Sequence, residues 1–209
     1  MPVEGALPRS MDATTAPAAA RVAQERLSKP VGWWGMLAFV TSEATLFGAM
    51  IGSFFFLRFQ AVHWPPPGTP AKDPTIPLIM VAVLVATSIP MQLAAGAGLR
   101  GRVRTAWLLV LLALGVQAGY FAYEIHDFQA DLQRFSPHDN AYSSLYYTLL
   151  GADHLHVGVG LLFSLWLVVR LFRGLTNYRL NGLRAITLYW HAVNVITVFV
   201  FLTILSPSL

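Results

Sequence analysis

Five long apolar stretches dominate the chain and alternate with short polar connections. Each stretch is long enough for a helix to cross a hydrocarbon layer of about 30 Å. None shows the two-residue alternation of a membrane β-strand. The pattern therefore predicts an all-α integral membrane bundle of five transmembrane helices, with approximate limits 31–57, 76–98, 104–124, 142–171 and 183–206.

The composition is typical of a membrane protein, and it excludes sites that depend on cysteine. Hydrophobic residues make up 56% of the 209-residue chain and charged residues only 11%, against about 25% charged in soluble domains. Residues 1–30 are rich in Ala, Pro, Thr and Arg, so we expect a mobile N-terminal tail before a membrane domain over 31–209. The sequence contains no cysteine, which excludes disulfides, thiolate iron–sulfur sites and covalent haem attachment.

The charges in the connections predict how the bundle is oriented. The connections after the second and fourth stretches are basic, whereas those after the first and third are balanced or acidic. Basic residues also occur in the tail. Because short cytoplasmic segments carry an excess of Lys and Arg, we expect a cytoplasmic N-terminus and a C-terminus outside. The same rule explains the net charge of +4 without nucleic-acid binding.

Glu43 is the only ionisable residue in the first stretch. It lies about 18 Å from the start of that stretch at ~1.5 Å per helical residue, near the middle of the membrane. A carboxylate there costs at least about 2.5–3.5 kcal/mol on insertion scales. Glu43 is therefore either a protonated group that packs against a neighbouring helix or a titratable group for protons, a lipid head group or a partner.

Histidines lie at similar depths on other helices. His156 is about 21 Å and His191 about 12 Å from the basic end at ~1.5 Å per residue, which allows Glu43 to meet a histidine. His154 and His156 point about 200° apart on a helix and cannot easily share one ion. We expect imidazoles that hydrogen-bond across helices, and predict no metal site and no catalytic residue. Haem ligation by His156 with His191 stays open.

Glu124 ends the third stretch beside Tyr120 and Tyr123. At the outer interface a carboxylate costs little, and aromatic residues collect there. Glu124 is then either a polar residue at a helix end or a functional one.

Four motifs occur in order along these stretches. They are W-G-x-x-x-F-x-x-S-E ending at Glu43, then Trp107, Gln117 and Glu124 around the third stretch, L-H-V-x-x-G over 155–160, and Y-W-H-x-V containing Trp190 and His191. Together they resemble subunit III of the haem-copper oxidases, in the short five-helix form found in bacteria, and the likeness covers about residues 30–206.

The resemblance implies a non-catalytic subunit of a respiratory terminal oxidase, of the cytochrome c oxidase type, in the bacterial inner (plasma) membrane. In that family subunit III packs on subunit I, in a complex that also contains subunit II. Haem and copper belong to the partner subunits, with no cofactor expected in this chain, and phospholipid occupies a cleft. The family's subunit III supports proton uptake and stability during turnover. Proton or lipid roles are assigned to Glu43, His156 and His191, and subunit packing to Trp190, Asn194 and Glu124.

Three departures from the family pattern accompany the resemblance. Asp153 stands where the family often has histidine, Asn194 replaces an acid in W-H-x-x-D, and the two opening helices of the longer form are missing. The electron donor, cytochrome c or a quinol, stays open.

Other functions remain possible on the residues alone. One is the subunit-III-like partner of a nitric oxide reductase. Another is a small proton-coupled transporter with Glu43 as its coupling site and a helix broken near Pro90. A third is a self-contained haem-binding membrane enzyme.

Overall fold

The computed structural model describes residues 30–70, 73–174 and 176–207, so the predicted tail at 1–29 lies outside the described residues. The described residues form helices and connections, with no strand. Five helical segments are long and apolar enough to cross a membrane when α3 and α4 are counted as one. The predicted all-α membrane architecture is confirmed. The helices are α2 (Val31–Gln60), α3 (Thr75–Ala86), α4 (Ser88–Leu99), α5 (Val103–Leu132), α6 (Ala141–Phe172) and α7 (Asn177–Leu205).

Two helices extend beyond their apolar stretches. The predicted end of the third helix at 124 is wrong, because α5 continues to Leu132. Polar residues lower the hydropathy there, but Asp131 is buried and accepts a hydrogen bond from the Tyr146 hydroxyl. α7 begins at Asn177, before the predicted start at 183, because the Thr176 hydroxyl accepts from the Arg179 backbone N–H and caps the helix.

The second spanning segment is interrupted at Thr87, between α3 and α4. Pro90 has no N–H to donate to the carbonyl four residues earlier, which breaks the helical pattern. The Thr87 hydroxyl donates to the Leu84 carbonyl oxygen at 2.6 Å and accepts from the Gln117 side chain at 3.2 Å. A helix broken near Pro90 is an expectation of the transporter alternative; here the interruption is mild, and the Thr87 hydroxyl and the Gln117 side chain of α5 bond to each other across it.

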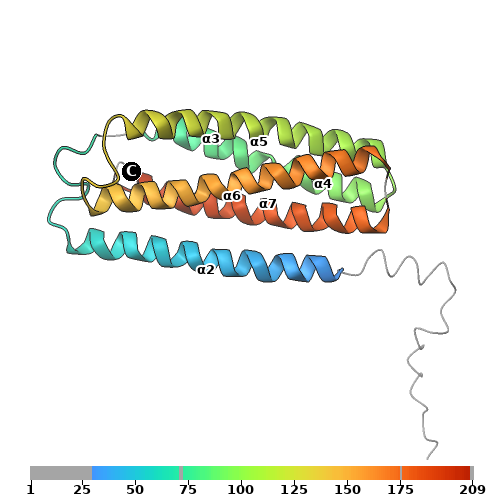
Figure 1. The fold of residues 1–209 in the computed structure, drawn as a ribbon, viewed down its shortest axis with the longest axis horizontal. Helices are drawn as coiled ribbons and strands as arrows, with labels where there is room; N and C mark the ends of the chain where they lie inside the picture. Colours follow the sequence, from blue (N-terminus) through green and yellow to red (C-terminus); the bar gives the residue numbers. More distant parts are fainter. Residues whose placement is uncertain (1–29, 71–72, 175, 208–209) are drawn as a thin grey trace, which may run out of the picture.

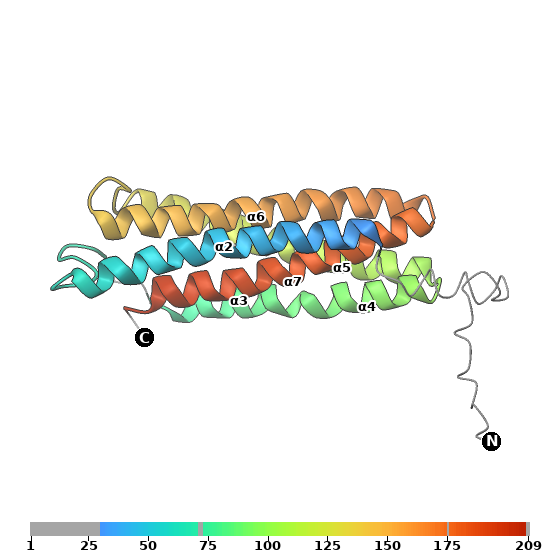
Figure 2. The same ribbon diagram turned by 90° about the horizontal axis from the view of Figure 1, so that it is seen from below.

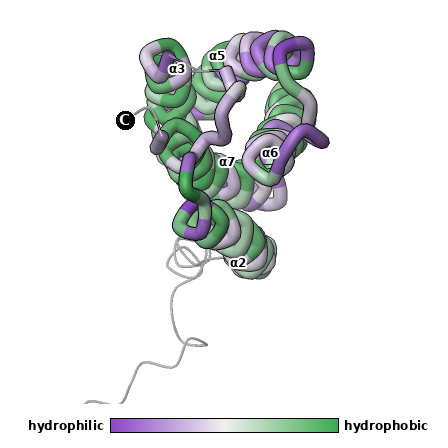
Figure 3. Tube along the Cα trace, turned by 90° about the vertical axis from the view of Figure 1, so that its left-hand side faces the viewer, coloured by the Kyte–Doolittle hydropathy of each residue, from purple (hydrophilic) through white to green (hydrophobic). Residues whose placement is uncertain are grey.

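The helices run side by side along one axis (Figures 1 and 2). Viewed along that axis, α3, α5, α6 and α7 form one group and α2 lies against its outside (Figure 3). α7 packs against α2, α3, α4 and α6. α2 buries only Val40, Phe47 and Phe54, so most of its surface is left for lipid or for another chain.

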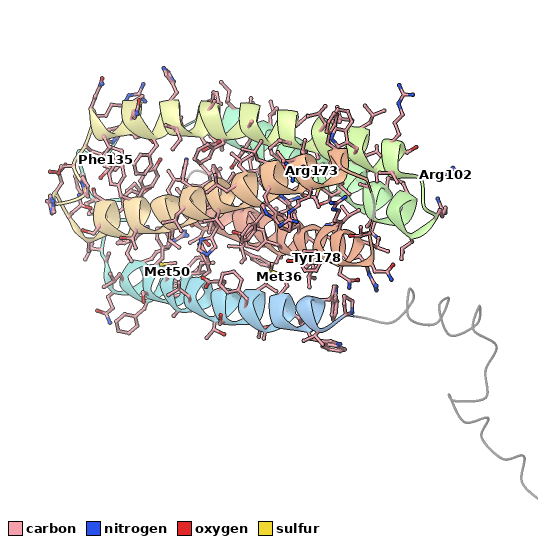
Figure 4. All side chains as sticks on the ribbon, turned by 45° about the vertical axis from the view of Figure 1, so that its right-hand side comes forward. Met36, Met50, Arg102, Phe135, Arg173 and Tyr178 are labelled. Atoms are coloured by element: carbon pink, nitrogen blue, oxygen red, sulfur yellow. The ribbon has the colours of Figure 1, made fainter. Side chains whose placement is uncertain are left out.

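Charge divides between the two ends of the bundle. Arg102, in the α4–α5 turn, and Phe135, in the α5–α6 loop, lie at opposite ends (Figure 4). The start of α2 and the α6–α7 connection lie at the Arg102 end (Figure 1). The opposite end, which we call the acidic end, carries Asp73, Asp131 and Asp139 alongside Arg58 and Arg134. The chain thus presents a basic end and an acidic end, and the predicted orientation, with the basic end cytoplasmic, stays a prediction.

Candidate functional site

Glu43 of α2 and His156 of α6 meet across the bundle surface. Glu43 Oε2 lies 3.0 Å from His156 Nε2. The Glu43 side chain is 20% exposed and that of His156 12% exposed. Glu43 thus meets a histidine of another helix, which the depths of the two residues allowed.

The hydrogen bonds of His156 fix how many protons this pair holds. Its Nδ1 lies 2.7 Å from the carbonyl oxygen of Ala152. Because a carbonyl only accepts, Nδ1 carries a proton, and Nε2 of the neutral ring is an acceptor. The 3.0 Å contact with Glu43 therefore needs one further proton between Oε2 and Nε2. Whether that proton sits on the acid or on the ring, the pair has no net charge, which suits a membrane interior.

Aromatic groups and α7 hold this pair in place. The Phe47 ring packs edge-on against the His156 ring, with centroids 5.1 Å apart. The Tyr189 hydroxyl of α7 donates to the His156 backbone carbonyl at 2.8 Å. Three helices, α2, α6 and α7, therefore set the geometry of the pair, while the Glu43 carboxyl stays partly exposed.

His154 makes a second imidazole–carboxyl pair on the opposite side of α6. Its Nδ1 contacts the Leu150 carbonyl, the same i−4 arrangement that His156 uses. Its Nε2 lies 3.9 Å from Glu124 Oε2 of α5. The two histidines thus face different helices and different acids, as the angle of about 200° between positions i and i+2 on a helix predicts.

Glu124 is buried between helices and is not at a helix end. It lies well inside α5, which runs on to Leu132, and only 2% of it is exposed. Tyr120, one turn earlier, is also buried. The prediction that Glu124 ends its helix is wrong, because α5 continues for two further turns past it.

Asp153 lies next to this second pair and is fully enclosed. Only 1% of it is exposed, and its Oδ1 accepts from the Thr197 hydroxyl of α7 at 2.7 Å. The position at which the sequence departs from the family pattern thus places an additional carboxyl in the centre of the bundle.

His191 lies on a different face, at the junction of α7 and α4. Its Nε2 is 3.1 Å from Gln92 Oε1, an acceptor, so the ring donates. It lines two hollows that meet at this residue. One, of about 330 Å³, is lined by residues that include Trp33 and Arg184. The other, of about 220 Å³, is walled mainly by apolar side chains of α3 and α7.

Trp190 is completely buried between α7 and α6. Its Nε1 donates to the Ser164 hydroxyl at 2.8 Å. A Cβ at Gly160 would lie 2.8 Å from the indole, so glycine is required there for the two helices to approach. The glycine of L-H-V-x-x-G and the tryptophan of Y-W-H-x-V therefore form one contact.

Asn194 joins α7 to the interruption between α3 and α4. Its amide donates to the Ser88 hydroxyl at 2.7 Å and contacts the Leu84 carbonyl at 3.4 Å. A carboxylate could not donate to either oxygen, so asparagine suits this position. Trp190, Asn194 and Glu124 all lie inside the chain, and any effect of theirs on partner subunits acts through helix packing.

Residues 30–70, 73–174 and 176–207 contain no group of three or more His, Asp or Glu side chains placed to hold a metal ion. His156 pairs with Glu43 and His191 with Gln92. Both rings therefore have hydrogen-bond partners within the chain.

Sequence reasoning missed the buried polar face of α5. Gln117, Tyr120, Glu124 and Asp131 are all buried and follow spacings of three, four and seven, which place them on one side of a helix. This periodicity is visible in the sequence, but only if the helix is extended past 124.

Comparison with known proteins gives the family. The family described as "Cytochrome c oxidase subunit III" matches residues 24–208. Cytochrome c oxidase subunit 3 of Bacillus subtilis is 30% identical over 187 residues, with 87% of each chain covered. That of Pisaster ochraceus is 33% identical over 184 residues, covering 82% of this chain and 68% of the relative.

A quinol-oxidising relative is similarly close. Cytochrome bo(3) ubiquinol oxidase subunit 3 of Pseudomonas aeruginosa is 30% identical over 176 residues, covering 80% of this chain and 81% of the relative. Together with the five spanning helices, the bacterial relatives identify a multi-pass protein of the bacterial plasma membrane. The chain belongs to the cytochrome c oxidase subunit III family.

Proposed function

We propose that this chain is the non-catalytic subunit III of a bacterial respiratory oxidase, and that it packs on subunit I in a complex with subunit II, where the partner subunits carry the haem and copper. The family match over residues 24–208 carries this proposal. The relatives include both a cytochrome c oxidase and a ubiquinol oxidase, so they leave the electron donor open.

The test is purification of the tagged chain from its own membrane in mild detergent, followed by an absorption spectrum. Haem bands together with larger membrane subunits are expected, and the haem type would narrow the donor. A colourless chain that purifies alone would contradict the proposal and favour the transporter hypothesis. Co-purification with the subunits of a nitric oxide reductase would favour that alternative.

Within this function we propose that Glu43 and His156 exchange a proton with the surface of the bundle. The pair holds one proton in a hydrogen bond of 3.0 Å, and its acid is 20% exposed. Water that reaches the exposed edge can remove or supply that proton, which is the behaviour that support of proton uptake requires.

Glu43→Gln tests this role, because the amide can still donate to His156 but cannot release a proton. We expect an assembled oxidase that takes up protons more slowly or inactivates sooner during turnover. Thr45→Val is the matched control, since the Thr45 hydroxyl is exposed on the same helix and bonds only to its own backbone, at Thr41. Proton uptake and inactivation equal to wild type in Glu43→Gln would contradict the role.

We also propose a phospholipid site at the two hollows that meet at His191. Arg184 and Trp33 line the hollow nearer the basic end, where a phosphate head group would lie. Val195, Val198 and Phe199 line the hollow that continues along α7, and they suit an acyl chain. The hollow beside Arg184 would thus hold the charged head group, and the apolar hollow next to it would hold the acyl chain.

Bound phospholipid can be counted by phosphorus analysis or native mass spectrometry of the purified complex. Arg184→Ala is expected to lose phospholipid relative to wild type. Arg100→Ala, an exposed arginine at the same end, is the control and should keep it. Equal lipid content in all three proteins would contradict the site.

A further inference from the structure

We propose that Glu124, Asp153 and His154, with Tyr120, form a second proton-binding site inside the bundle, separate from the Glu43–His156 pair. The side chains come from α5 and α6, and Thr197 of α7 closes the site. More than nine-tenths of each residue is buried. The site belongs to the chain itself, so it does not depend on which oxidase contains the chain.

The charge balance requires bound protons. The spanning helices carry no Lys or Arg at the level of this site, since their basic residues lie near the helix ends. His154 is the only group of the site that can become a cation, and it faces two acids. Two carboxylates with one imidazolium would leave a net negative charge in a dry interior, which is strongly unfavourable. The state of least charge therefore keeps at least one proton on Glu124 or Asp153.

The ionisable groups around the site do not change this balance. α7 contributes Tyr189, which lies within electrostatic range of Asp153. On the other face of α6, His156 is also within range of Asp153, but it shares its proton with Glu43 of α2. The segment 75–99, which forms α3 and α4, contains no ionisable side chain.

The Tyr120 hydroxyl supplies an independent sign of a site. It is buried, and within the described part of the chain it has no hydrogen-bond partner. Glu124 and Asp153 both lie within electrostatic range of it. A buried hydroxyl is rarely left without a partner, and this one can donate to a carboxylate or accept from a carboxylic acid. In this structure it is hydrogen-bonded to neither acid, so it adds a buried polar group to the site that is still open to a bond.

A route to water leads toward the α5–α6 loop. Phe128 packs against the His154 ring at 5.3 Å and against the Tyr147 ring at 5.4 Å. Beyond this aromatic layer, at the acidic end of the bundle, is a hollow of about 220 Å³ whose lining includes Asp131 and Arg134. Glu124 and Asp131 are two turns apart on α5, about 10 Å at 1.5 Å per residue. Phe128 thus separates the site from the polar hollow.

Infrared spectroscopy of the purified complex tests the site, because only a protonated carboxyl gives the C=O stretch of a carboxylic acid. We expect Asp153→Asn or Glu124→Gln to remove part of this signal, whereas Glu43→Gln leaves that part in place. Carboxylic-acid spectra of both Asp153→Asn and Glu124→Gln that equal wild type would overturn the proposal.

Thr197→Val keeps both acids, so it tests the site even if Asp153→Asn or Glu124→Gln fails to fold. If Asp153 carries the proton, loss of the Thr197 hydroxyl shifts its C=O stretch to higher frequency. If Glu124 carries it, Thr197→Val leaves the band in place and Glu124→Gln removes it. A band unaffected by Thr197→Val, Glu124→Gln and Asp153→Asn contradicts the site.

Deuterium exchange tests the route. Phe128→Ala is expected to speed the shift of the buried carboxyl band in heavy water several-fold. Phe47→Ala, which removes the ring beside His156, is the matched control and should leave that rate unchanged. Equal rates in Phe128→Ala and wild type, or a larger effect of Phe47→Ala, would overturn the route through the aromatic layer.

Discussion

Two histidine–glutamate pairs lie on opposite sides of α6, and they differ in what surrounds them. His156 meets Glu43 at 3.0 Å where α2 lies against the outside of the bundle, and His154 faces Glu124 at 3.9 Å inside it. Both rings use Nδ1 on the carbonyl four residues earlier. The same local arrangement therefore gives an accessible pair on one face and an enclosed pair, with Asp153 beside it, on the other.

The difference teaches that burial decides the role of an ionisable residue in this bundle. The outer pair holds one proton with no net charge and can exchange it at its exposed edge. The inner pair lies beside a further acid, Asp153, and its imidazole is the only group there that can become a cation. The inner site is therefore uncharged only if its acids hold protons. Substitutions that act on one pair, or on the helix that carries both, can separate these roles.

The largest effect is expected from Trp190→Ala, which disturbs α6 itself. The indole fills the space over Gly160 and bonds to Ser164, and its loss should cost about 3–5 kcal/mol of unfolding free energy. Helix content followed during denaturation in mixed detergent micelles measures this. Trp34→Ala, at a side chain that is 57% exposed, should change stability by less than about 0.5 kcal/mol. Equal stability of the two variants would show that α6 is held by other contacts.

His154→Ala should destabilise the chain more than His156→Ala. Removing one partner of a buried pair costs about 3–5 kcal/mol, whereas loss of one hydrogen bond at the partly exposed pair costs about 1 kcal/mol. The same denaturation experiment compares the two variants directly. The reverse order would mean that the outer pair, and not the enclosed one, stabilises the fold.

Thr197→Val removes a single hydrogen bond from Asp153. We expect a loss of about 1 kcal/mol, because the carboxyl stays buried with one donor fewer. Thr203→Val is the control, since its hydroxyl bonds only to its own helix at Phe199, and its effect should be smaller. A Thr197→Val variant no less stable than Thr203→Val would argue that Asp153 does not need this donor.

Glu43→Gln should have the smallest effect on stability, less than about 0.5 kcal/mol. The amide preserves the contact with His156, and the side chain is not fully enclosed. Its effect is expected on proton exchange during turnover instead. A loss of stability as large as that of His154→Ala would show that Glu43 is a structural residue.

The sequence alone was enough to predict the class of the protein. Five apolar stretches, the isolated Glu43 and the ordered motifs predict a five-helix membrane bundle of the oxidase subunit III family, and the family match confirms this. The sequence also showed that Glu43 lies at a depth similar to that of a histidine on another helix, because depth along a helix follows directly from residue number.

Only the tertiary structure decided which groups are enclosed. Hydropathy shows how well a segment suits lipid, but it does not show where a helix ends. From hydropathy alone the third helix was therefore predicted to end at Glu124, whereas α5 continues to Leu132. Which histidine meets which acid depends on how each helix is rotated about its axis, and packing sets that rotation. For this reason Glu124, Asp153 and His154 became one site only when α5, α6 and α7 were brought together.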